Sequence, residues 1–276
     1  MLKKVDLNNL NEVVDLAYQM NCDERTSCKA PFLKDRKTIE KRFIKTLEHP
    51  KEVIIAEYTD NELKGVFSYL VDQDSRYLEC ISGFFKDEKT LDHIINYMKN
   101  NYRGWHMDLV FPKENTMVLN YLKKINGNFD PVQLDMELEV GELKVQEIKS
   151  NLNIFEYDEK YYEEYHKIHT TNCYWIAEKI VKALDKFNIY LAVDNDEVVG
   201  YLDISKKNDI YDLFVKESLR GKGYGRALMQ MGINQAIENE GKIILNVNED
   251  NEIAYQLYKS LGFKEYGNSV TVGVEL

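Results

Sequence analysis

Three glycines and three cationic side chains alternate through the seven residues Arg220–Arg226, between a strand-like run and an amphipathic run. The first backbone N–H groups of a helix have no partner within the helix, and the helix dipole makes that end positive. Glycines allow an anion to approach such N–H groups closely. These residues therefore predict a site for a phosphate-bearing ligand at the start of a helix.

Two common phosphate-binding patterns do not fit this loop. A P-loop needs Ser or Thr directly after its Lys, but Gly223 follows Lys222. A dinucleotide-binding fingerprint has the form G-x-G-x-x-G, and here Arg226 stands three residues after Gly223 in place of the last glycine. A third pattern is therefore needed.

The pattern Arg220-x-x-Gly223-x-Gly225 resembles the acyl-CoA pyrophosphate loop of the GNAT superfamily of N-acetyltransferases. A second motif of that family, N-x-x-A-x-x-L-Y followed by G-F, is matched here by Asn251, Ala254, Leu257, Tyr258, Gly262 and Phe263. The two motifs occur in the family's order, with room between them for one helix and one strand. The likeness covers Asp209 to Tyr266, and the preceding hairpin extends it to Phe187.

The resemblance implies that acetyl-CoA is the co-substrate and indicates its contacts. Leu213, Phe214 and Val215 would end a strand that splays from its neighbour and exposes main-chain groups to pantetheine. Asn251 would contact the pantetheine arm or only cap its helix, since Asn is a common N-cap. The pyrophosphate would be held by N–H groups and cations of Arg220, Gly221, Lys222, Gly223, Tyr224, Gly225 and Arg226.

The resemblance also implies catalytic roles. A backbone N–H near Phe214 or Val215 would polarise the thioester carbonyl. Tyr258 stands where the family keeps its general acid, and a phenol can protonate a leaving thiolate. Asp209 opens the strand Ile210–Val215 at about the position of a carboxylate base in some members. Asp212 is a second candidate, expected on the opposite face of that strand unless a bulge changes the alternation. Many members rely on water relays, so no base is required.

The segment before the hairpin is expected to form two short helices on the acceptor side. An aromatic and acidic lining there would suit a cationic amine, although an aromatic core with solvated glutamates is the stronger interpretation. His166 and His169 share a helix face, but no third ligand completes a metal site, so no metal is expected. The residues of this segment are Tyr161, Tyr162, Glu163, Glu164, Tyr165, His166, His169, Tyr174 and Trp175.

The chain contains two copies of one plan. Ala56 and Ala192 lie 136 residues apart, as do Asn115 and Asn251, and each copy has a hairpin signal with an Asn/Asp turn. We therefore expect an α/β (α+β) protein with two tandem GNAT-like domains, residues 1–140 and 141–276. Each is expected to have a mixed, mostly antiparallel sheet with helices on both faces.

The first copy lacks the residues that would carry the chemistry. Phe84, Asp87 and Lys89 stand where Arg220, Gly223 and Gly225 stand, and Leu122 replaces Tyr258. Asp87 places a negative charge where a pyrophosphate would lie. The first copy is therefore expected to be degenerate and not to bind acyl-CoA in the usual way. The first copy would either form part of the wall of the acceptor cleft or have a purely structural role.

Composition and net charge limit the partners, the compartment and the functions that the chain can have. A net charge of −11 argues against nucleic acid as a partner and mildly favours a cationic amine. There is no membrane-length apolar run or signal peptide, and the four scattered cysteines suit reduced thiols, so a cytoplasmic protein is expected. The predicted function is acetyl transfer from acetyl-CoA to a primary amine of a small molecule or peptide. The alternative is a non-catalytic acyl-CoA-binding sensor or scaffold. Acceptor, acyl preference and oligomeric state stay open.

Overall fold

The chain divides into two compact units in a computed structural model that describes residues 1–23, 25–28, 35–147, 152–171 and 173–276. Unit 1 comprises Met1–Leu134, Asn248–Asp250 and Gly267–Leu276. Unit 2 comprises Asp135–Val247 and Asn251–Tyr266. The predicted division into 1–140 and 141–276 describes halves of the sequence, whereas each compact unit also includes a segment from the other half.

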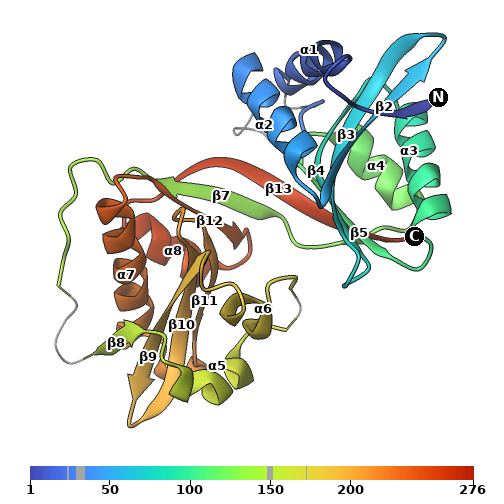
Figure 1. Ribbon diagram of the computed structural model, residues 1–276. Coiled ribbons are helices and arrows are strands. Elements are labelled where there is room, and N and C mark those ends of the chain that lie inside the picture. Colours follow the sequence, from blue (N-terminus) through green and yellow to red (C-terminus); the bar gives the residue numbers. More distant parts are fainter. Residues whose placement is uncertain (24, 29–34, 148–151, 172) are drawn as a thin grey trace. The chain divides into compact units, whose positions relative to one another are not determined.

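Unit 1 is a mixed sheet with α1 and α2 against one face and α3 and α4 against the other (Figure 1). Its strands follow the order β1-β2-β3-β4-β5, and β4 and β5 are parallel while the preceding pairs are antiparallel. Residues Val270–Glu275 at the end of the chain pair antiparallel with β5. The elements are β1 (Leu2–Lys4), α1 (Leu10–Asn21), α2 (Arg36–Glu48), β2 (Glu52–Thr59), β3 (Glu62–Asp72), β4 (Tyr77–Phe85), α3 (Glu88–Asn101), β5 (His106–Phe111), α4 (Thr116–Lys124) and β6 (Asn128–Phe129).

Unit 2 contains an antiparallel sheet in the order β11-β10-β9-β8, with α7 on one face and α5 on the other (Figure 1). Beyond it, β12 lies next to β7, where Lys242 forms an ion pair with Glu137. The elements are β7 (Gln133–Leu138), β8 (Asn153–Glu156), η2 (Glu159–Tyr161), α5 (Tyr162–Ile168), α6 (Ala177–Val181), β9 (Phe187–Asp194), β10 (Glu197–Ser205), β11 (Ile210–Val215), η3 (Glu217–Leu219), α7 (Tyr224–Glu238), β12 (Ile243–Asn248) and α8 (Glu252–Ser260). The last strand, β13 (Lys264–Glu275), has its first three residues in unit 2 and the rest in unit 1.

The two predicted hairpins form in the same way. In each, two consecutive Asn/Asp residues with positive φ connect the strands: Asp60 and Asn61 in the first, Asn195 and Asp196 in the second. A two-residue turn with both φ values positive matches the twist of the flanking strands, and Asn and Asp tolerate that conformation better than most residues. These turns and the layers around them confirm the predicted mixed, mostly antiparallel sheets with helices on both faces.

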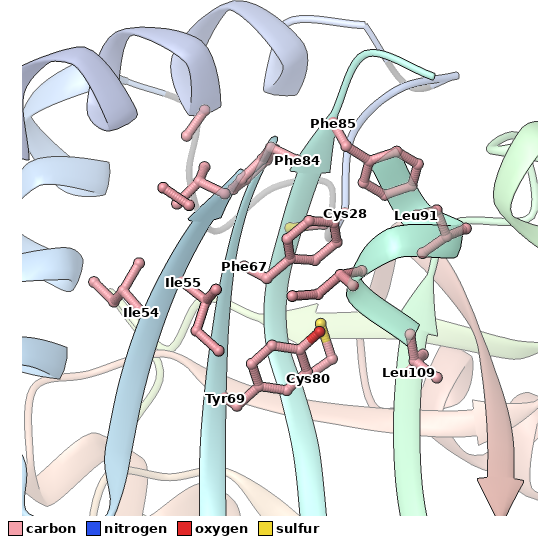
Figure 2. Close-up of a cluster of buried hydrophobic side chains, with 14 of the residues drawn as sticks. Cys28, Ile54, Ile55, Phe67, Tyr69, Cys80, Phe84, Phe85, Leu91 and Leu109 are labelled. Atoms are coloured by element: carbon pink, nitrogen blue, oxygen red, sulfur yellow. The ribbon is translucent and has the colours of Figure 1, made fainter. Parts of the chain in front are cut away.

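The core of unit 1 is packed with aromatic and aliphatic side chains around β3, β4 and α3 (Figure 2). Phe67 stacks on Phe85 at a ring-centroid distance of 5.4 Å, and Phe85 meets Phe111 edge-on. Cys28, from the segment after α1, is buried in the same cluster. The segment after α1 therefore contributes directly to the interior of this unit.

Candidate active site

A cavity of about 350 Å³ in unit 2 brings the two predicted motifs together. It lies beside the end of β11, the loop before α7 and the start of α8. Of the predicted cofactor-binding residues, Lys222 alone is absent from its wall. Those that line it are Leu213, Phe214, Val215, Arg220, Gly221, Gly223, Tyr224, Gly225, Arg226 and Asn251.

The cavity opens where β11 and β12 separate. Among the described residues, the two strands are joined by a single parallel bridge between Asp209 and Ile244, with the Ile244 N–H donating to the Asn208 carbonyl. Past this bridge, β11 is an edge strand of its sheet. An edge strand presents unpaired N–H and C=O groups, so the predicted splay supplies an open backbone edge.

The alternation of β11 indicates which groups face that edge. The Lys216 N–H donates inward to the Val199 carbonyl of β10 at 2.8 Å. Because backbone groups along a strand alternate in direction, the N–H groups of Val215 and Leu213 point outward. Arg220 Nε donates to the Val215 carbonyl oxygen at 3.2 Å, which confirms the outward direction of Val215. The candidate carbonyl-polarising donor is therefore Val215 or Leu213 rather than Phe214.

The start of α7 meets the requirements of an anion site. Its N-cap is Gly223, with φ +99°, and no side chain caps the helix. Gly221 also has a positive φ of +78°, and a Cβ there would meet no atom within 4 Å. Glycine adopts this conformation without the steric cost that other residues pay. The first N–H groups of α7 are thus left for a ligand beside Arg220 and Arg226.

Tyr258 is nearly buried on α8, with 6% of its surface exposed, and its ring lies 5.9 Å from that of Phe263. Burial raises the pKa of its hydroxyl well above the ordinary value, and the negative charge of Asp212 raises it further. The phenol therefore keeps its proton at neutral pH and can act as a donor. Tyr258 and the two candidate carboxylates, Asp209 and Asp212, are not among the residues that line the cavity.

The two candidate carboxylates differ in their surroundings. Asp209 belongs to a tight turn, where its carboxylate accepts from Ser205 Oγ at 3.0 Å and its N–H donates to the same oxygen. Asp212 accepts a hydrogen bond from the Tyr201 hydroxyl at 2.6 Å. A bulge at Tyr211 changes the alternation, because Asp203 pairs with Asp212 while Ile204 pairs with Ile210. Asp212 therefore shares the face of the sheet that α5 covers.

Comparison with known proteins identifies the fold around this cavity. Residues 151–263 match the Acetyltransferase (GNAT) family. These residues form a GNAT domain. The matched range includes the loop before α7 and the α8 motif that build the cavity.

Three curated relatives of the chain are named as acetyltransferases. It is 36% identical over 75 residues to mycothiol acetyltransferase of Corynebacterium efficiens, a match covering 25% of each protein. It is 35% identical over 94 residues to peptidyl-lysine N-acetyltransferase YjaB of Escherichia coli, covering 33% of this chain and 60% of that enzyme. The chain thus spans between a quarter and three fifths of the length of these relatives.

Solved structures resemble the whole chain in fold. A GCN5-related N-acetyltransferase from Sphaerobacter thermophilus matches with a TM-score of 0.70 at 12% identity, covering 100% of this chain and 95% of that one. A tandem GNAT protein from the clavulanic acid biosynthesis pathway matches with a TM-score of 0.63 at 12% identity, covering 100% and 98%. The likeness supports the predicted tandem GNAT-like fold.

Some of the aromatic residues that were predicted on the acceptor side are buried in the core of the GNAT domain, and others lie nearer its surface. Tyr165 is fully buried and His169 is 5% exposed, so the aromatic-core interpretation holds for both. Residues that sequence reasoning missed lie between them and β11: Tyr201 and Asp203, both fully buried on β10. An Asp within the apolar run Val198–Ile204 was the available signal, because a buried carboxylate requires partners.

Asn251 caps α8 by accepting from the Ala254 N–H at 3.2 Å, as the capping interpretation predicted, and it also lines the cavity. Its counterpart in unit 1, Asn115, accepts from the Val118 N–H and donates from Nδ2 to the Ser27 carbonyl at 2.9 Å. In unit 1 the amide group is therefore occupied by the chain itself.

Two searches of the described residues gave negative results. No group of three or more His, Cys, Asp and Glu residues in this part of the chain is placed to hold a metal ion. None of the helices within the same residues is both long and apolar enough to cross a membrane.

Proposed function

We propose that unit 2 binds acetyl-CoA in the cavity beside β11 and transfers its acetyl group to a primary amine. The observation that carries the proposal is the meeting, in one cavity, of an open strand edge and an uncapped helix start. The edge suits the amide groups of a pantetheine arm, and the helix start suits a pyrophosphate. Acetyl-CoA supplies an activated thioester, and the chain supplies the groups that orient it.

The N–H groups of α7 and the cations around them would hold the pyrophosphate. A helix start carries about half a positive charge, and anions there gain about 0.3–1 kcal/mol or more when partly buried. Arg226 Nη2 donates to Ser260 Oγ at 2.5 Å, which holds its guanidinium at the mouth of the cavity. Lys222, outside the cavity wall, would add only long-range attraction.

The outward N–H of Val215 or Leu213 would polarise the thioester carbonyl, and Tyr258 would protonate the departing thiolate. Donors that are fixed before the reaction stabilise developing charge without reorganisation. The raised pKa of Tyr258 keeps its proton available for transfer. Removing the hydroxyl should therefore affect turnover and leave cofactor affinity unchanged.

The proton of the attacking ammonium would pass to Asp212, directly or through water. The carboxylate of Asp212 is partly exposed and its charge raises the pKa of Tyr258, whereas the carboxylate of Asp209 is bonded to Ser205. Asp209, which the sequence also suggests, is the competing candidate. The relatives named for peptidyl-lysine and mycothiol support a primary amine as the acceptor class. The free cysteines suit a reducing compartment such as the cytoplasm.

Unit 1 would not bind acyl-CoA, which would make it the degenerate copy. Asp87 is the N-cap of α3, and its carboxylate accepts from both the N–H and the hydroxyl of Thr90 at 2.8 Å. The end of β4 is closed by buried Phe84 and Phe85 (Figure 2). Together with the contact between Asn115 and Ser27, these side chains would occupy the places in unit 1 that correspond to the ligand site of unit 2.

Calorimetric titration with acetyl-CoA, followed by turnover assays on primary amines and lysine peptides, tests the proposal. One site per chain and measurable turnover are the expected results. With an accepted amine, Asp212→Asn should lower kcat by about 100-fold, the lower range for general base catalysis. Asp209→Asn tests the competing candidate and should leave kcat unchanged. Two acetyl-CoA sites per chain would contradict the proposal that unit 1 does not bind the cofactor. Binding of acetyl-CoA without turnover of any amine tested would favour the alternative, a non-catalytic acyl-CoA sensor.

A further inference from the structure

A line of hydrogen-bonded and stacked side chains crosses the acceptor side of unit 2. It begins at Asp203, passes through His169 and Tyr201, and ends at Asp212. The first three are at most 5% exposed, while Asp212 is half-buried at the end of the line. Asp212, the candidate base, is thus supported by three interior residues.

His169 is held on both ring nitrogens. Nε2 lies 2.8 Å from Asp203 Oδ2, and Nδ1 lies 2.7 Å from the Thr170 carbonyl oxygen. A carbonyl oxygen and a carboxylate are both acceptors, so this geometry fits a doubly protonated imidazolium. Tyr165 adds its hydroxyl to Asp203 at 2.9 Å, which further satisfies the buried carboxylate. The ring of His169 is therefore fixed in orientation.

Tyr201 is fixed between these groups and Asp212. Its ring stacks on His169 at 4.9 Å with an interplanar angle of 10°, and on Phe214 at 5.7 Å on the strand that carries Asp212. The Tyr201 hydroxyl accepts from the Thr170 N–H at 3.1 Å and donates to Asp212 Oδ2 at 2.6 Å. With its acceptor and donor functions both used, this hydroxyl can hold the carboxylate in one orientation.

We propose that Tyr201 is a positioning residue that holds the Asp212 carboxylate in the orientation required to receive the acceptor's proton. The inference deepens the proposed function and rests on it. Asp212 Oδ2 is bound by the hydroxyl. Within the described part of the chain no hydrogen bond to the other oxygen, Oδ1, is found, and this oxygen would receive the proton of the ammonium or of its water. A carboxylate that could rotate freely would spend less time aligned, and misalignment lowers the rate.

The first test compares Tyr201→Phe with Tyr190→Phe. Tyr190 is a matched control, because it is also buried and its hydroxyl bonds Gln235 on α7, away from Asp212. Tyr201→Phe should lower kcat for an accepted amine about tenfold, which corresponds to about 1.4 kcal/mol, and leave KM for acetyl-CoA unchanged. Tyr190→Phe should change neither. Equal kcat values for wild type and Tyr201→Phe overturn the proposal.

The second test does not require turnover. Cys173 is exposed, and its thiol pKa is raised by partial burial and by the charges of Asp212 and Asp203. With exposed Cys22 replaced by Ser, the alkylation rate of Cys173 by iodoacetamide reports the position of the Asp212 charge. Asp212→Asn should accelerate alkylation, because it removes one of the negative charges that, in addition to burial, raise the pKa of the thiol.

A double-mutant cycle then joins Tyr201→Phe to Asp212→Asn. If Tyr201 holds the carboxylate in place, Asp212→Asn will change the alkylation rate by a different factor in the Tyr201→Phe background. Additive effects of the two substitutions overturn the positioning role even if no acceptor is found. Failure of acetyl-CoA binding or turnover in the wild type, by contrast, would count against the proposed function.

Discussion

Asp87 and Gly223 are the N-cap residues of corresponding helices, yet only Asp87 caps its helix with a side chain. In α3 the carboxylate accepts the Thr90 N–H, so the helix start is satisfied within the chain. In α7 the same place is left to backbone N–H groups beside a cavity. One position thus separates a self-capped helix from a helix start that is suited to an external anion.

Gly223→Asp should reduce acetyl-CoA affinity by roughly 100-fold, because opposing like charges costs several kcal/mol. Gly223→Ala is the control: it shares the strain of a positive φ but adds no charge. Calorimetry on both variants separates the two effects. Equal losses would mean that backbone strain, and not charge, controls the site.

Asp87→Ala should destabilise unit 1 by about 1 kcal/mol, the usual cost of removing an N-cap. Acetyl-CoA binding should remain at one site with unchanged affinity, because buried Phe84 and Phe85 still close the end of β4. Chemical denaturation and calorimetry measure the two quantities. The appearance of a second site would show that the Asp87 carboxylate alone had excluded the ligand.

Tyr258→Phe should lower kcat by about 100-fold, within the range for losing a general acid. Its acetyl-CoA affinity should be unchanged, because the hydroxyl acts on the leaving sulfur. Tyr255→Phe on the same helix is a suitable control, since the Tyr255 hydroxyl bonds Glu265 at the surface. A wild-type kcat in Tyr258→Phe would transfer the acid role to another group or to water.

His169 should titrate above its ordinary pKa of 6.5. Burial alone would lower its pKa, but the hydrogen bond and charge of Asp203 outweigh that effect. Because the folded-state pKa is raised, the contribution of His169 protonation to stability is fully present below pH 6.5 and is lost as pH rises through the folded value. Nuclear magnetic resonance titration of the imidazole, assigned with His169→Gln, measures this pKa. A value below 6.5 would contradict the imidazolium assignment.

The Asp203 carboxyl adds a second pH-dependent contribution. Burial raises its pKa to about 6, although His169 opposes the shift. A carboxyl with a raised folded pKa loses stability as pH rises from 3.8 to about 6, because the folded state binds the proton more tightly. Asp203→Asn should therefore flatten the stability profile over this interval in thermal unfolding. An unchanged slope would assign the buried proton to another group.

The sequence predicted the cavity better than the network behind it. The loop around Gly223 and the α8 motif around Tyr258 are local patterns whose chemistry depends on neighbours in sequence, so the structure brings them together as expected. Tyr201 and His169 are 32 residues apart and stack only after α5 packs on β10. Such a contact has no local signal. The bulge that turns Asp212 inward likewise depends on pairing with β10.

The exchange of segments between the units has a consequence for synthesis of the chain. Strand β5 gains its outer partner, residues Val270–Glu275, only from a segment that follows the GNAT-family residues 151–263 in the sequence. Until then its edge is open, and open edges are prone to pair with other chains. Unit 1, although made first, cannot complete its sheet before the GNAT domain has been translated. Loss of a few C-terminal residues should therefore damage the N-terminal unit first.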